Sequence, residues 1–92
     1  MDRESTVEFY STSFAATEIL NVKILGARME AGRLLETGVL ADMRGQDSYA
    51  LLDRALTKLK ESRALMDELY EQIGRMRAIA KKSVALPEHD LL

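Results

Sequence analysis

Cysteine and tryptophan are both absent from this 92-residue sequence. Without cysteine the chain has neither a disulfide framework nor a thiolate metal site, and this composition suits a reducing compartment. A domain of this size buries only about 60 to 65% of its unfolded surface, so it is marginally stable unless something helps. Because disulfides are excluded, oligomerisation is the remaining route to stability.

Aromatic residues and proline are also scarce, at 5% of the sequence and a single residue respectively. The chain is 47% hydrophobic and 30% charged, which is typical of a folded globular protein. Leucine, alanine and five methionines favour long helices and leave little material for a β-sheet. The composition therefore predicts an all-α fold.

Neither an excess of one charge nor a long apolar run is present. The formal net charge of -2 gives no reason to expect DNA or a membrane surface as a partner, because both select a basic face. Apolar runs of three or four residues are too short to span a bilayer. The first five residues lack the basic start and apolar core of a signal peptide, so we expect a cytoplasmic protein.

The clearest break in the helical pattern is at residues 43–48, where Gly45 suits the left-handed position after a helix and Asp47 suits an N-cap. Pro87 disfavours helix at Leu86. We therefore expect one domain, 1–92, built as an antiparallel hairpin of two long helices. Its parts are an N-terminal arm (1–12), a first helix (13–44), a turn (45–47), a second helix (48–85) and a tail (86–92).

Both helices carry apolar stripes that are too wide for a single neighbour. The first has the three-and-four spacing of a helix at Leu20, Ile24, Ala27, Ala31, Leu34, Gly38 and Ala41, and is widened by Ile19, Val22, Leu25, Met29 and Val39 in flanking positions. The second repeats every seven residues at Leu52, Leu59, Met66, Ile73 and Ala80, and is widened by Leu51, Leu56, Leu65, Tyr70 and Ile79. Further helices must come from other chains. A helical-bundle homo-oligomer is expected, and a dimer forming a four-helix bundle is its simplest form.

Three glycines of the first helix, Gly26, Gly32 and Gly38, each cost about 1 kcal/mol in helix propensity. They are explained either by close approach of a neighbouring helix or by a ligand that rests on the backbone. The start of the chain is also open to two interpretations. Ser5 and Glu8 could form a capping box, while residues 11–13 could interrupt the helix or cap a new one.

The N-terminal arm gathers Val7, Phe9, Tyr10 and Phe14, which either pack on the hairpin or a neighbouring subunit or form an aromatic ligand platform. On the first helix, Lys23 lies between two apolar residues. It could extend out of an oligomer interface or grip a phosphate. The tail around Pro87 is expected to pack or to be disordered, with recognition by a partner as the alternative.

Catalytic groups are not evident. His89 is the only histidine, which argues against a metal site and against a nucleophile with its base. No phosphate-binding glycine motif is present. The acidic residues of the second helix alternate with Lys58, Lys60, Arg63 and Arg75 at spacings that favour surface ion pairs. We therefore expect no enzyme and no cofactor.

Two segments resemble a known family. Val22-Lys23-Ile24-Leu25-Gly26 is similar to a motif in the first helix of phage cyclic-oligonucleotide sponges, in which an Ile-Arg or Ile-Lys pair is followed by two residues and a glycine. Residues 55–61 (Ala-Leu-Thr-Lys-Leu-Lys-Glu) resemble a run in their second helix. These helical-hairpin proteins counter the bacterial CBASS defence. The resemblance covers about residues 7 to 65.

The resemblance implies a non-catalytic protein that binds a cyclic dinucleotide or trinucleotide in pockets between subunits, inside the host bacterium. It implies that Tyr10 stacks on a base and that Lys23 meets a phosphate. Phe9 and Gly26 lie beside these two residues, and Arg63 and His89 are candidates for a second pocket. The alternative from the residues alone is a helical adaptor or inhibitor that binds a protein through helix–helix contacts.

Overall fold

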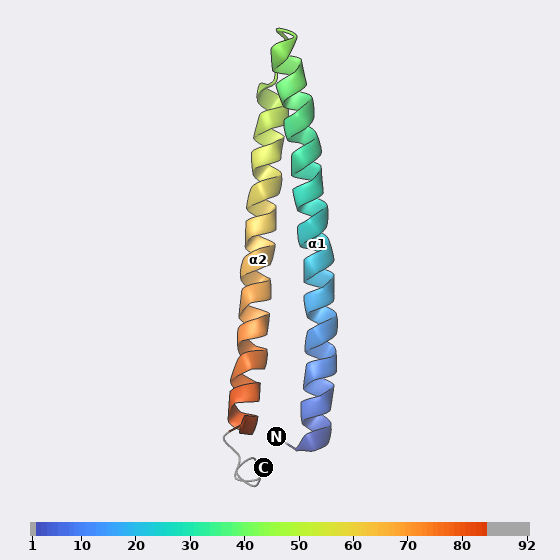
Figure 1. Cartoon of the computed structure of the whole chain (residues 1–92), viewed down its shortest axis with the longest axis vertical. Coiled ribbons are helices and arrows are strands. Elements are labelled where there is room, and N and C mark those ends of the chain that lie inside the picture. Colours follow the sequence, from blue (N-terminus) through green and yellow to red (C-terminus); the bar gives the residue numbers. More distant parts are fainter. Residues whose placement is uncertain (1, 85–92) are drawn as a thin grey trace.

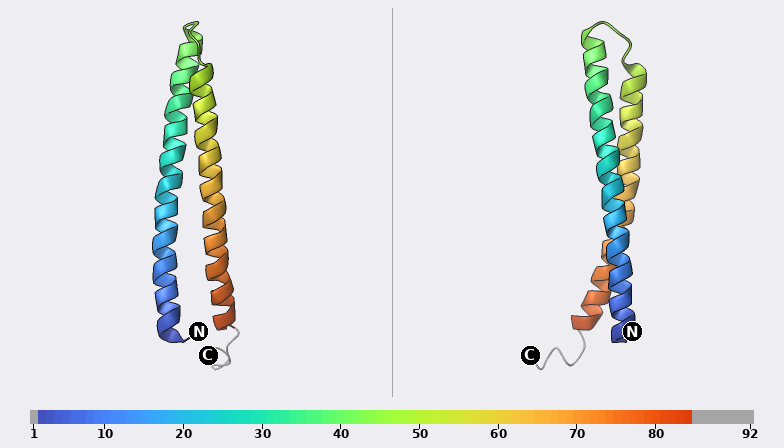
Figure 2. Two further views of the ribbon diagram at one scale, coloured as in Figure 1. Left: turned by 180° about the vertical axis from the view of Figure 1, so that it is seen from behind. Right: turned by 90° about the vertical axis from the view of Figure 1, so that its right-hand side faces the viewer.

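The computed structural model describes residues 2–84, with the backbone alone for 83 and 84. Two helices, α1 (Arg3–Met43) and α2 (Tyr49–Val84), form an antiparallel hairpin (Figure 1). They run side by side and cross at a shallow angle, as the two further views show (Figure 2). The molecule measures 70 × 20 × 17 Å, so it is one helix layer thick. The expected all-α hairpin is confirmed.

The prediction of a separate N-terminal arm (1–12) is wrong, because α1 begins at Arg3. Residues 3–12 are the first three turns of α1, and residues 11–13 neither interrupt that helix nor cap a new one. Asp2, not Ser5, is the N-cap, and its carboxylate accepts a hydrogen bond from the Ser5 amide at 2.7 Å. The Thr17 hydroxyl donates a hydrogen bond to the Phe14 carbonyl within α1. A polar side chain can therefore be satisfied inside this helix without interrupting it.

The turn has the predicted chemistry. Gly45 has a φ of 73°, the left-handed conformation that closes a helix. The Gln46 amide donates to the Ala41 carbonyl and the Gly45 amide to the Asp42 carbonyl, which is the Schellman arrangement. Asp47 accepts from the Tyr49 amide at 3.0 Å, the first amide of α2. The helix begins one residue later than expected, so Ser48 rather than Asp47 holds the N-cap position, and its carbonyl accepts from the Leu52 amide. Pro87 and the tail lie outside the described residues.

The hairpin seam is the line along which α1 and α2 pack. On α1 it includes the buried residues Ile24, Ala27, Ala31, Leu34 and Gly38, which confirms the stripe expected there. On α2 it includes the buried residues Ala55 and Ser62 and the half-buried residues Leu51, Lys58, Leu65, Leu69, Gln72, Met76 and Ile79. Both sets recur at alternating steps of three and four residues, as in a coiled coil.

The regular seven-residue repeat of α2 is not the surface that the seam buries. Leu59, Met66 and Ile73 are 49%, 50% and 51% exposed, although their spacing is the more regular one. The seam instead takes the stripe that contains Lys58, Ser62 and Gln72. The side of α2 that carries Leu59, Met66 and Ile73 is therefore the place where the predicted further neighbour of α2 would bind, because these large apolar side chains are uncovered in the single chain.

The core of one chain is small. Its buried apolar residues are Ile24, Ala27, Ala31, Leu34 and Ala55, and no large side chain among the described residues is completely buried. Gly38 allows the close approach of the helices, because a Cβ there would lie 2.9 Å from Leu52 Cδ2. Gly26 and Gly32 meet nothing within 4 Å, so their expected close approach is not made inside this chain. Neither helix, over the described residues, is long and apolar enough to cross a membrane.

Candidate functional site: an apolar face of the hairpin

An apolar groove of about 430 Å³ runs along one side of the seam near the turn. Its walls come from both helices: Arg28, Ala31, Gly32 and Leu35 of α1, and Leu52, Ala55, Leu56 and Leu59 of α2. Arg28 is the only charged residue among them. Because residues of the two helices line one groove, residues 28, 32 and 35 flank the same side of the seam as residues 52, 56 and 59.

The groove is one end of a longer surface. In a hairpin with a seven-residue repeat, side chains seven residues apart share a face. Positions that are seven residues, or a multiple of seven, away from the groove residues carry further apolar side chains along both helices. We call the resulting surface the open face; its apolar members are Val7, Phe14, Leu25, Leu35 and Val39 of α1 and Leu52, Leu56, Leu59, Met66, Tyr70 and Ile73 of α2. All are exposed except Leu52, which is half-buried.

The charges at open-face positions balance. The same steps of seven reach Glu4, Glu18 and Asp42 and three arginines, Arg28, Arg63 and Arg77. Arg28 and Arg63 lie at similar heights, since the contacts of Gly38 with Leu51 and Leu52 and of Tyr10 with Met76 fix which parts of the helices are opposite. The open face is therefore neutral overall, with a pair of arginines near its middle.

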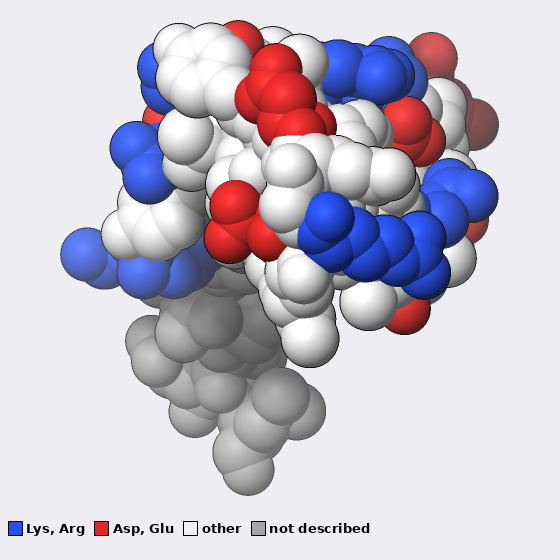
Figure 3. Space-filling model, turned by 90° about the horizontal axis from the view of Figure 1, so that it is seen from above, with Lys and Arg blue, Asp and Glu red and all other residues white. Residues whose placement is uncertain are grey.

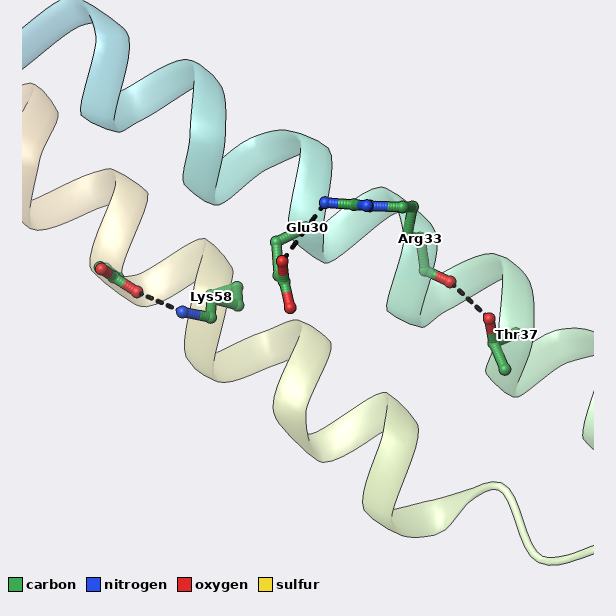
Figure 4. Close-up of polar contacts among 5 residues, drawn as sticks. Glu30, Arg33, Thr37 and Lys58 are labelled. Carbon is green, nitrogen blue, oxygen red and sulfur yellow. Dashed lines mark hydrogen bonds and ion pairs between the residues drawn. The ribbon is translucent and has the colours of Figure 1, made fainter.

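The opposite flank of α2 is polar. Lys58 pairs with Glu61 at 3.2 Å, and on α1 Arg33 pairs with Glu30 at 3.4 Å (Figure 4). Thr37 donates to the Arg33 carbonyl. These pairs are exposed and link positions three residues apart, so each contributes little to stability. Viewed over the turn, Lys and Arg are interspersed with Asp and Glu around the molecule, with uncharged residues between them (Figure 3). The predicted surface pairing is confirmed for Lys58.

Tyr10, the proposed base-stacking residue, lies with its neighbour Phe9 at the open end of the hairpin. Tyr10 is half-buried at the seam, where its hydroxyl lies 3.4 Å from the Met76 carbonyl. The Phe9 ring is half-buried and meets the Tyr10 ring edge-on, with centroids 5.5 Å apart. The Tyr10 ring thus serves the contact between α1 and α2 in the single chain, and the Phe9 ring packs against it.

The structure does not gather the other candidates around Tyr10. Lys23 is exposed beside Glu18, Ile19 and Val22 on a shallow part of the α1 surface. It lies 13 residues from Tyr10, or about 20 Å along the helix. Gly26 is exposed, and Arg63 is on the open face. His89 lies outside the described residues, among which no cluster of three possible metal ligands occurs.

The apolar side of α1 that belongs to the open face was recognised from sequence only in part. Leu25 and Val39 were placed in flanking positions of the stripe, whereas Val7, Phe14 and Leu35 were not assigned to it. Its residues are separated by Ser11, Glu18, Asn21 and Arg28, which hide the repeat from a simple count of apolar positions. The available signal was the seven-residue spacing of Val7, Phe14 and Leu35 and of Leu25 and Val39. No protein-family model, curated protein or solved structure shows significant similarity to the chain.

Proposed function

We propose that this protein is a non-catalytic interaction module that binds other α-helices through its open face. The observation that carries the proposal is the exposure of large apolar side chains from both helices on one side of the seam. Contiguous apolar patches of this kind mark interaction surfaces, whereas apolar residues scattered singly do not. Two neighbouring helices make a ridged groove that fits a third and a fourth helix.

Co-purification tests this function. The tagged chain is expressed in its source cell, and the proteins retained with it, including untagged copies, are identified by mass spectrometry. Replacing Leu59 and Ile73 together by Gln should abolish retention, because it places two uncompensated amides in the contact. Lys60→Gln on the charged flank is the matched control and should retain the same proteins. Equal retention by all three proteins contradicts the proposal.

Sequestration of a cyclic oligonucleotide is a second proposal, favoured by Lys23. Its ammonium is exposed, and no ion pair is found for it within residues 2–84. Because Lys23 and Tyr10 are far apart along α1, a ligand that contacts both must lie between subunits. Titration calorimetry with a panel of cyclic dinucleotides and trinucleotides tests this proposal. Binding that Lys23→Ala weakens, with helicity unchanged, supports it, and the absence of heat with every ligand contradicts it.

A further inference from the structure

The chain exposes far more surface than a compact monomer of its size. Its accessible area is 7484 Å², whereas about 5,400 Å² is expected for a folded chain of 10.3 kDa. Its radius of gyration is 20.7 Å, against about 12 Å for a compact domain of this length. Even half of the excess area exceeds the roughly 800 Å² that each partner buries in a standard stable interface.

We infer that the open face is covered by a second copy of this chain, packed antiparallel so that the turns lie at opposite ends of a four-helix bundle. This inference rests on the proposed function and names the partner. A second hairpin has the same length and the same two-helix width as the surface to be covered. The neutral charge of the open face also suits self-association, because a strongly charged partner would gain nothing there.

Arg28 and Arg63, near the middle of the open face, distinguish the two possible orientations of the second hairpin. A symmetric pair of hairpins can place its turns together or at opposite ends. With the turns together, α1 faces α2 of the partner, and Arg28 comes close to the partner's Arg63 at two symmetric places. Such repulsion between like charges at an interface disfavours that arrangement.

In the opposite orientation α2 faces its own copy, so Arg63 lies near Arg63 of the second copy at one place close to the symmetry axis. This is one contact between like charges in place of two, and α1 makes complementary pairs. Helix α1 then faces its own copy, and with full overlap its middle residue, Lys23, lies at the height of the symmetry axis. A residue that precedes Lys23 by a given number of positions then lies at the same height as the residue of the second copy that follows Lys23 by that number. Arg28 therefore lies opposite Glu18 of the second copy, and Phe14 lies opposite Gly32. The open space at Gly32, which nothing in its own chain fills, receives an aromatic ring.

Spin-label distances on the intact chain test this arrangement. Since the sequence has no cysteine, Gln46→Cys gives a single label at the turn. Sedimentation of the purified protein should show a dimer, and pulsed dipolar spectroscopy should give a label separation of about 60 to 70 Å, the length of the bundle. A separation of about 10 to 20 Å means that the turns lie together and overturns the orientation.

A charge exchange provides the second measurement. Arg28→Glu and Glu18→Arg should each weaken dimerisation by about five- to tenfold, because each faces like charges at two places, and the double variant should restore it. Circular dichroism shows whether each variant stays helical. Lack of restoration in helical variants overturns the pairing. If the purified chain is a monomer while open-face variants still lose a different partner, the inference of a second copy fails and the proposed function stands.

Discussion

Gly38 is the residue at which the packing of the hairpin depends on a missing side chain. Gly38→Val should lower the free energy of unfolding by about 1 to 3 kcal/mol, because the added Cβ lies 3.2 Å from Leu52 Cγ and 3.4 Å from Leu51 Cβ. Gly26→Ala is the control, since a Cβ added at Gly26 would meet no other part of the structure within 4 Å beyond its own helical turn, and it should stabilise the helix by up to about 1 kcal/mol. Urea unfolding measures both changes, and equal effects would contradict this role for Gly38.

Asp2 gives the start of α1 a dependence on pH. The hydrogen bond from the Ser5 amide lowers the pKa of its carboxyl below 3.8. A carboxyl whose pKa is lower in the folded state stabilises that state above its unfolded pKa, and this contribution is lost as the pH falls through the folded value.

In an NMR titration the Ser5 amide shift should therefore change with a midpoint below 3.8. Asp2→Asn should keep the cap and abolish this titration, whereas Asp2→Ala should loosen the first turn at every pH. A midpoint at or above 3.8 is incompatible with the cap.

At the level of elements, the seam side of α2 contains polar residues, namely Lys58, Ser62 and Gln72. Gln72 is half-buried in the seam, where it accepts a hydrogen bond from Arg75. Gln72→Leu should raise the free energy of unfolding by about 1 kcal/mol, because it adds apolar burial and removes only an exposed hydrogen bond. Glu71→Leu, one residue away on the charged flank, should give no gain. Thermal unfolding monitored by circular dichroism compares the two, and a gain from Glu71→Leu alone would argue against this position of the seam.

The two helices and the turn were predictable because the residues that determine them act on their near neighbours in the sequence. Gly45 and Asp47 act within a few residues of the turn, so the boundary between the helices was found to within one residue. The start of α1 was not found, because Asp2 and Ser5 are both acceptable N-caps and only the observed bond separates them. Which stripe of α2 the hairpin buries was not predictable either. Leu59 and Leu65 are equally apolar, and the choice between their sides depends on the fit to α1.

For the candidate site, sequence reasoning identified the need for more helices but not the surface that receives them. It placed the site near Tyr10 and Lys23, which lie on different sides of α1. The open face depends on how α1 and α2 are rotated against each other, since only that rotation brings Leu35 and Leu59 to one groove. A pattern along one helix holds no information on this rotation.

For the whole molecule, folding and association are expected to be coupled. Among the described residues of one chain no large side chain is completely buried, and the large apolar side chains of the open face are exposed. We therefore expect a large part of the stability to come from the second hairpin. When a dimer unfolds to two chains, each tenfold rise in protein concentration stabilises it by about 1.4 kcal/mol. The melting temperature should therefore rise with concentration, and the dependence should disappear in the Leu59→Gln and Ile73→Gln double variant if that variant remains a helical monomer.

Gly26 and Gly32 separate the stability of the hairpin from that of the bundle. Both have open space in the single chain, but only Gly32 is on the open face. Leucine at either position gains similar helix propensity, so Gly26→Leu should raise the melting temperature at all concentrations. Gly32→Leu should instead weaken dimerisation by about tenfold or more, because it fills the space that receives Phe14 of the second copy. Sedimentation equilibrium measures the dimer constant of both variants. Equal dimer constants would mean that no side chain enters the space at Gly32 and that the antiparallel packing is wrong.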